Sequence, residues 1–479
     1  MKSLFVLFFC LAFTFANAQS YIVKSIKSFG AKGDGITSDQ DAFEKAAIYF
    51  NERGGNGKLL IPKGVYIVDR QKFTGGQLNK VAYAGENVMY FNNIQNFAIQ
   101  GVTGSILKYK GSMRIGSFSP VTGEIYHPSK LPFSDRTYAA IPGNCITLIK
   151  SKGINISNIN LDGNNMNMII GGIYGDQGIQ LQHYGIFIMN SQNVTVESVN
   201  VHHFGLDGIS ISNEKNSSPD SIKILNSSFE YNARQGLSWV GGNDLQVKNC
   251  KFNHTGRGKF SSSPGAGLDV EAEVGPIRNG VFDNCEFIDN TGPGVGADSG
   301  NSGDCTFNNC IFWGTTYYSI FINKPNFTFN QCTIYGNAAI LYRSTNQPNS
   351  TKFFGCHFED KPYNGKGPYG AYLVESNDAK YTSFTNCTFT SNIKKLCWLQ
   401  TGTGSPVEEK YHLINCQFTI NNNNLPVNDF IAIMRGVVII NCTFNFTNKE
   451  AKTKRYSFGD TNPLTSSGSY GSKVLIEGK

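Results

Sequence analysis

The sequence has few charged residues and, beyond its first eighteen residues, no long hydrophobic run. Asp, Glu, Lys and Arg make up 16% of the 479 residues, and the formal net charge is +7. No later stretch reaches the ~18 consecutive apolar residues that cross a bilayer, so a membrane-spanning helix is not expected there. Basic runs interleaved with aromatic residues are also missing, which argues against a nucleic-acid partner. The chain is instead rich in Gly (52 residues) and aromatics (13%), which is typical of a β protein with many tight turns.

The first eighteen residues have the pattern of an export signal. Lys2 is followed by an apolar run over residues 4–15 and by Ala16-Asn17-Ala18, a small-x-small cleavage motif. We therefore expect a signal peptide over residues 1–18 and a mature chain from Gln19. The expected product is a secreted or periplasmic monomer without a membrane anchor.

A four-residue phrase, Asn-Cys-x-Phe, recurs along the chain. Copies start at residues 249, 284, 309, 386, 415 and 441, with variants at 226, 331 and 355, at intervals of 22 to 35 residues. This spacing predicts one solenoid coil per copy. Cys and Phe are two residues apart, so on a strand both side chains point to one face, which we expect to be the interior. The Asn before each Cys is expected in a bend, where its side chain bonds backbone groups of the next coil.

Eleven cysteines follow the predicted signal peptide. Eight of them occupy the repeat phrase, where Cys behaves as a small buried hydrophobe, so buried thiols are favoured over disulfides for these eight. The pairing of Cys145, Cys305 and Cys397 stays open.

A second repeat, called the second ladder below, consists of short segments in which apolar residues alternate with others. It has the same period as the Asn-Cys-x-Phe phrase. Its members begin at Gly185, Gly208, Gly236, Gly267, Gly294 and Ser319. Two columns with one period predict an all-β fold, a single-stranded parallel β-helix. The expected layout is an N-terminal cap and first coils over 19–140, further coils of the same domain over 141–446, and a C-terminal tail over 447–479.

The open N-terminal end of such a coil needs a cover. Ser38 as N-cap, followed by apolar residues at helical spacing up to residue 50, predicts an amphipathic capping helix. Residues 28–35 and 59–66 on either side are expected to be the first strands.

These opening segments resemble a known superfamily. Residues 28–35, the helix with Asp39 and Ala42, and the segment Leu60-Ile61-Pro62-Lys63-Gly64-Val65-Tyr66 are similar to the start of the pectate-lyase-like right-handed parallel β-helices. That superfamily includes polygalacturonases, rhamnogalacturonases, polysaccharide lyases, epimerases and phage tailspikes. The resemblance implies three sheets per coil and an active groove on the outer face of one sheet in the middle coils.

The polygalacturonase catalytic set is not present in this chain. Its Asn-Thr-Asp, Asp-Asp, Gly-His-Gly and Arg-Ile-Lys motifs do not occur at successive coils, so no catalytic residue is carried over from that family. Residues 234–238 and 265–271 instead look like a pattern that recurs in bacterial exported β-helix proteins. The resemblance therefore suggests a shared site without naming a substrate.

The second ladder predicts which side chains point outward. One outward column holds Ser210, Ser238, Asp269, Gly296 and Phe321, and the next holds Ser212, Val240, Glu271, Asp298 and Asn323. Asp269 and Glu271 would then lie ~6.6 Å apart along one strand, with Asp298 ~4.8 Å from Glu271 on the next coil. Crowded carboxyl groups raise one another's pKa, which gives the protonated acid and ionised base or nucleophile that glycoside hydrolysis requires.

The sequence thus predicts an enzyme that hydrolyses a polysaccharide, of acidic, pectin-like or other uronate-containing type. The predicted catalytic residues are Asp269, Glu271, Asp298 and Arg234. The predicted substrate-binding residues are Asp207, Gln235, His183, His202, His203, Tyr184 and Tyr318. The hydrolase is expected to need neither metal nor cofactor.

Two alternatives to hydrolysis remain open from the sequence. One is a lyase or epimerase acting on a uronate polymer, in which the three carboxylates hold Ca²⁺ and Arg234 or a His is the base. The other is a non-catalytic β-helix that binds or adheres to glycans.

Overall fold

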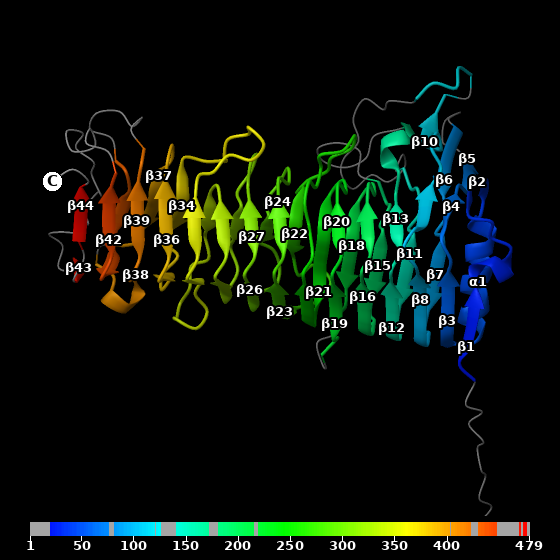
Figure 1. Cartoon of the computed structure of the whole chain (residues 1–479), viewed down its shortest axis with the longest axis horizontal. Helices are drawn as coiled ribbons and strands as arrows, with labels where there is room; N and C mark the ends of the chain where they lie inside the picture. The colour runs from blue at the N-terminus through cyan, green and yellow to red at the C-terminus, as the bar shows by residue number, and fades with distance from the viewer. Residues whose placement is uncertain are drawn as a thin grey trace, which may run out of the picture.

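The computed structural model describes residues 20–75, 81–119, 121–125, 140–171, 181–214, 219–402, 404–422, 430–447, 469–470 and 473–476. These residues form one elongated coil in which strands from successive turns stack along the long axis (Figure 1). The predicted signal peptide, residues 1–18, lies outside the described residues.

Most full turns of the coil contribute a strand to each of three parallel sheets; the turn that contains Lys251 meets the third sheet only through isolated bridges. The first sheet contains β7 (Met89–Asn92), β11 (Ile146–Ile149), β15 (Ile186–Met189), β18 (Asp207–Ser212), the start of β21 (Gln235–Lys248), β22 (Ala266–Val270), β25 (Val295–Ala297), β28 (Ile320–Ile322), β31 (Ala338–Ile340), β34 (Tyr372–Asn377), β37 (Lys395–Gln400) and β40 (Ile433–Arg435).

The second sheet follows the first along each coil, and β21 runs through both. It contains β1 (Ile22–Ser25), β3 (Gly55–Ile61), β8 (Gln95–Gly101), β12 (Lys152–Ser157), β16 (Gln192–Glu197), β19 (Ile222–Leu225), the end of β21, β23 (Ile277–Asp283), β26 (Cys305–Asn308), β29 (Phe327–Asn330), β32 (Lys352–Phe354), β35 (Ser383–Thr385), β38 (Tyr411–Ile414), β41 (Val437–Ile440) and β43 (Ser469–Tyr470).

The third sheet completes each coil. It contains β2 (Asp34–Ser38), β4 (Gly64–Val68), β9 (Ser105–Tyr109), β13 (Asn160–Asp162), β17 (Asn200–His202), β20 (Ser228–Glu230), β24 (Glu286–Ile288), β27 (Ile311–Trp313), β30 (Thr333–Tyr335), β33 (His357–Glu359), β36 (Thr388–Ser391), β39 (Gln417–Ile420), β42 (Thr443–Phe446) and β44 (Lys473–Ile476). A small additional sheet is formed by β5 (Gln71–Gly75), β6 (Val81–Gly85), β10 (Arg114–Phe118) and β14 (Ile169–Gly171).

The interior is built from the columns that the sequence predicts. Phe287 is fully buried and stacks between Phe252 and Phe312, with ring centroids 5.4 and 5.1 Å apart. All eleven cysteines among the described residues are buried free thiols, including the three whose pairing the sequence left open, Cys145, Cys305 and Cys397. Apolar contacts and buried thiols therefore hold the coils together without disulfides in this part of the chain.

The Asn of the repeat phrase makes the sharp bend between the second and third sheets. Asn249, Asn284 and Asn309 have φ of 55°, 52° and 53°, the left-handed conformation that Asn tolerates better than most residues. Their side chains differ from the prediction in one respect. Asn249 donates to the side-chain oxygen of Asn226 on the previous coil at 2.9 Å, so these amides bond one another rather than the backbone.

Helix α1 (Gln40–Glu52) covers the N-terminal end of the coil (Figure 1). Its apolar face is buried as predicted, and Phe50 packs against Phe97 with ring centroids 4.5 Å apart. The N-cap is Asp39 and not the predicted Ser38. The Asp39 carboxylate accepts the backbone N–H groups of Lys32 and Gly33 and makes no capping bond to the helix, because the preceding turn uses its oxygens.

Two predicted boundaries differ in the structure. Residues 28–35, predicted as a strand, form the end of the 3-10 helix η1 (Ile26–Phe29), a turn and the start of β2. At the other end, β43 and β44 pair with β41 and β42, so the coil continues beyond the predicted boundary at residue 446. The segment 59–66, by contrast, falls on β3 and β4 as expected.

Candidate active site

The predicted catalytic residues, together with Asp207 and Gln235, lie at the outer face of the first sheet. Ser210, Ser238, Asp269 and Gly296 are register partners on successive coils, which confirms the first outward column. The glycine that precedes each strand has a steric reason: a Cβ on Gly236 would lie 2.7 Å from the carbonyl oxygen of Gly267. A side chain at that position would therefore collide with the backbone of the next coil.

The second predicted column is less regular than the first. A bulge after Ile211 pairs Ser212 with Gly241, so the predicted neighbour Val240 is displaced from the column. Glu271 and Asp298 lie just beyond the ends of β22 and β25 and are not strand residues. The two side chains nevertheless lie close enough for Asp298 to raise the pKa of Glu271.

Arg234 and Asp207 form a buried ion pair at the edge of this face. The Arg234 Nε and Nη2 atoms donate to the two Asp207 oxygens at 2.9 and 2.6 Å, a bidentate arrangement. Asp207 has no exposed surface. Burial would lower the pKa of Arg234, but the Asp207 carboxylate raises it well above its usual range, so Arg234 stays cationic. Burial raises the pKa of Asp207, and Arg234 opposes that rise.

Gln235 orients the most buried of the three predicted catalytic carboxyl groups. Its Nε2 atom donates to Asp269 Oδ2, and Asp269 is only 4% exposed. The Gln235 Oε1 atom and the nearby Ser238 Oγ atom are buried and have no hydrogen-bond partner among the described residues. Buried polar atoms without partners are costly, so these two are suited to bond water or a ligand hydroxyl. Ser238 was in the predicted outward column but was not predicted as a site residue.

The carboxyl groups of Asp269 and Glu271 hold their protons unusually firmly. Burial, followed by the charge of Glu271, raises the pKa of Asp269 well above its usual range. Burial and the hydrogen bond with Asp298 raise the pKa of Glu271 to about 7. Glu271 is half-buried and Asp298 is exposed. Solvent therefore reaches the Glu271 carboxyl group, which holds its proton.

Aromatic residues flank the carboxyl groups on both sides. Tyr184 lies next to the Arg234 and Asp207 pair, and burial together with the Asp207 charge raises its pKa to about 12. Tyr318 lies further along the same face, and its hydroxyl group is 3.4 Å from Glu375 Oε2. Tyr317 stacks against Tyr369, with ring centroids 5.6 Å apart.

Glu375 and Tyr369 were missed by the sequence reasoning. Glu375 is the outward register partner of Ala339, two strands beyond Phe321. At these coils the glycine position of the second ladder is occupied by other residues. An alignment of outward residues that relies on this glycine therefore ends before it reaches Glu375. Following the apolar alternation through β31 and β34 would have found Glu375.

Three predicted substrate-binding residues do not join this group. His183 has no exposed surface and is packed against Tyr109 and Phe204, so it cannot contact a substrate directly. Burial lowers its pKa to about 3. His202 is the last residue of strand β17 in the third sheet and His203 follows it, and their rings contact each other. The tight turn between the third and first sheets carries their side chains away from the Asp207 face.

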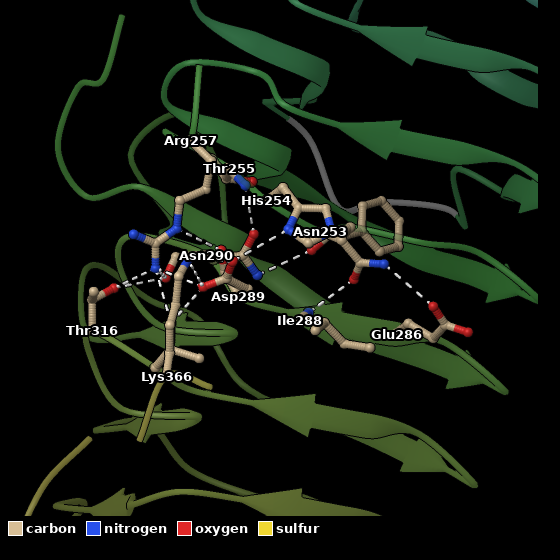
Figure 2. A network of polar contacts seen from close by, with 12 residues as sticks. Asn253, His254, Thr255, Arg257, Glu286, Ile288, Asp289, Asn290, Thr316 and Lys366 are labelled. Carbon is tan, nitrogen blue, oxygen red and sulfur yellow. Dashed lines mark hydrogen bonds and ion pairs between the residues drawn. The ribbon is translucent and has the colours of Figure 1, made fainter. Parts of the chain in front are cut away.

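A second polar network, at the end of β24, is structural. Figure 2 shows His254, Arg257 and Lys366 pointing toward Asp289, which Arg257 and Lys366 contact at 2.8 and 3.0 Å. Burial would raise the pKa of Asp289, but hydrogen bonds from His254, Thr315 and Lys366 lower it well below its usual range. The network ties loops of several coils together.

A hollow of ≈580 Å³ lies elsewhere, along the bend between the second and third sheets. Asn, Ser and Thr residues line it, and no carboxyl group does. It lacks the acid and base groups of the first-sheet face, so we place the candidate active site at Asp269 and not in this hollow.

Comparisons with known proteins agree with the architecture. Residues 218–389 match the family model described as right handed beta helix region. The N-terminal fragment of bacteriophage phi29 gene product 12 aligns over 94% of this chain and 71% of its own, at 14% identity and a TM-score of 0.54. The A-module of Azotobacter vinelandii mannuronan C-5 epimerase AlgE4 covers 83% of this chain and 96% of its own, at 14% identity and a TM-score of 0.47. The family 28 exopolygalacturonase of Yersinia enterocolitica covers 86% and 80%, at 12% identity and a TM-score of 0.37.

No curated protein matches the sequence. The structural comparison and the family model together confirm the right-handed parallel β-helix that the repeats predict. None of the helices among the described residues is long and apolar enough to span a bilayer. The molecule is therefore a right-handed β-helix that carries a group of carboxyl side chains on the outer face of its first sheet.

Proposed function

We propose that this protein hydrolyses glycosidic bonds of a polysaccharide that lies along the outer face of its first sheet. The observation that carries the proposal is the Glu271 carboxyl group, which has a pKa of about 7 and is hydrogen-bonded to the exposed Asp298. A glycosidase needs a carboxylic acid that still holds a proton near neutral pH.

The roles follow from exposure and hydrogen bonding. Glu271 gives its proton to the glycosidic oxygen as the bond to the anomeric carbon breaks, water adds to that carbon, and the proton that the water loses passes through solvent back to Glu271. Burial and the charge of Glu271 keep the proton on Asp269, and Gln235 holds the Asp269 carboxyl group in place.

The contacts of Arg234 weaken the elimination alternative. A lyase or epimerase needs a strong base near the sugar, but Arg234 is held cationic by Asp207. His183 is buried, and His202 and His203 lie on another face. The predicted bases are therefore charged, buried or on another face, whereas hydrolysis uses the carboxyl groups that are present.

The charges of the site bear on the substrate. Because Asp207 pairs with Arg234, this arginine is not free to bind the carboxylate of a uronate. Glu271 and Asp298 add further acidic groups on the same face. This favours an uncharged sugar at the cleavage position over the uronate that the sequence suggested. The aromatic rings of Tyr317 and Tyr318 are suited to stack on neighbouring sugars.

The test is a panel of neutral and uronate-containing polysaccharides, with reducing ends and product masses as readouts. Glu271→Gln should lower kcat at least ~100-fold because it removes the proton donor, and Glu286→Gln, on the third sheet of the same coil, should not. Product release by wild-type protein that Glu271→Gln leaves unchanged would refute the assignment. An unsaturated product that absorbs in the ultraviolet would establish a lyase, and binding without product would establish a glycan-binding protein.

A further inference from the structure

Two histidines and an aspartate meet on the outer face of the third sheet, away from the candidate active site. Asp162 in β13 and His202 in β17 are register partners on neighbouring coils. His203 follows in the left-handed conformation, with φ 56°, and its ring lies 5.0 Å from that of His202. Within the residues that the structure describes, these three form the one group of such side chains whose ligand atoms all lie within 4.8 Å of one another.

The ligand atoms of this group converge. The Nδ1 atoms of His202 and His203 are 2.7 Å apart, and His202 Nδ1 is 3.7 Å from Asp162 Oδ1. Tetrahedral coordination with metal bonds of about 2.0–2.1 Å places neighbouring ligand atoms ~3.3 Å apart. The two measured separations lie on either side of that value, so small rotations of the rings would complete the geometry.

Asn160 sets the tautomer of His202. Its Oδ1 atom is 3.0 Å from His202 Nε2, and because an amide oxygen only accepts, Nε2 carries the ring proton. The Nδ1 atom of the neutral ring then presents a lone pair toward His203 and Asp162. A ring N–H bonded to a neighbouring carbonyl group, with the other nitrogen left for an ion, is the usual arrangement around metal-binding histidines.

The carboxylate of Asp162 is also held in place. Its Oδ1 atom accepts the backbone N–H of Asn164 at 2.9 Å, and its Oδ2 atom is 3.1 Å from Lys108 Nζ. Lys108 therefore pairs with Asp162 Oδ2, whereas Oδ1 is the oxygen nearest to His202. On the other side, Glu230 is the register partner of His202 on the next coil and offers a further carboxylate oxygen.

We propose that Asp162, His202 and His203 bind one divalent transition-metal ion of the zinc type. Two imidazoles and one carboxylate suit zinc and its neighbours, whereas Ca²⁺ and Mg²⁺ prefer oxygen ligands. His203 would carry its proton on Nε2 when Nδ1 binds the ion. The ion would join two adjacent coils, with its remaining positions open to water or Glu230.

The experiment is a calorimetric titration of ZnCl₂ into the full chain, freed of metal by a chelator and of any affinity tag. We expect one Zn²⁺ per chain for the wild type, and no binding of Ca²⁺ at this site. His203→Asn should weaken Zn²⁺ binding at least ~100-fold, because a ligand is lost. Asn also tolerates the left-handed backbone at this position, so the variant is expected to fold.

The matched control is His254→Asn. His254 also has a left-handed backbone, with φ 58°, and stacks on Tyr231 at 4.8 Å as His203 does at 5.4 Å. It lies outside the three-residue group, so its replacement should leave Zn²⁺ binding unchanged. Asn160→Ala, which removes no ligand, should weaken binding ~10–100-fold with the fold preserved in circular dichroism.

Several results would overturn the proposal. Absence of saturable Zn²⁺ binding to the wild type would do so, as would equal affinities of the wild type and His203→Asn. An equal loss in His203→Asn and His254→Asn would show a general effect of removing histidine. Because the readout is metal binding, the outcome is independent of whether the protein cleaves glycans.

Discussion

Replacing Glu271 by Gln should stabilise the fold above pH 7 and leave its stability unchanged below pH 4. The pKa of Glu271 rises from 4.5 to about 7 because the side chain is partly buried and bonded to Asp298. Between these two pH values the folded state keeps a proton that the unfolded state has lost. Stability therefore falls as pH rises through this window, and the full penalty is present above pH 7.

The size of this penalty follows from the same values. A rise from 4.5 to about 7 corresponds to at most ~3 kcal/mol, at 1.36 kcal/mol for each pKa unit. Glu271 is only half-buried, so solvent screening reduces the expected effect to about 1–2 kcal/mol. Gln has nearly the same shape, can still donate to Asp298 and never ionises, so it removes this penalty alone.

The assay is urea denaturation followed by circular dichroism at pH 4 and pH 8. Glu271→Gln should raise the free energy of unfolding at pH 8 by about 1–2 kcal/mol and change it little at pH 4. Glu286→Gln serves as the control and should show no such difference between the two pH values. Equal stability of wild type and Glu271→Gln at both pH values would refute the raised pKa, and with it the assignment of Glu271 as the acid.

Three further predictions concern the fold. Arg234→Gln should destabilise the protein by about 3 kcal/mol because Asp207 stays buried without its partner, and adding Asp207→Asn should restore part of that loss; additive losses would contradict a pairwise role. Phe287→Ala should cost about 3–5 kcal/mol in urea denaturation, since the ring is fully buried between two others, and a loss under about 1 kcal/mol would be inconsistent with that packing. The eleven described thiols should react with a thiol reagent only after unfolding and without prior reduction, and a lower count in the unreduced, unfolded protein would reveal a disulfide.

The sequence by itself determined the coil and its interior. Strand alternation and the spacing of the repeat phrase are local properties, so they predicted that Phe287 would stack on its neighbours and that Asp269 would point outward. The outward column could be predicted because each coil repeats one backbone path. The glycine of the second ladder marked the start of that path, since a Cβ there would meet the next coil.

Only the tertiary structure decided how the site side chains are used. The pairing of Arg234 with Asp207 and the burial of His183 between aromatic rings both depend on side chains that lie one or more coils away. The local sequence therefore does not reveal them. His202 and His203 lie on another face because β17 belongs to the third sheet, and the chain bends before β18 joins the first sheet. Turn geometry, bulges and side-chain rotamers respond to contacts between coils, and the lengths of the loops that set those contacts carry no periodic signal in the sequence.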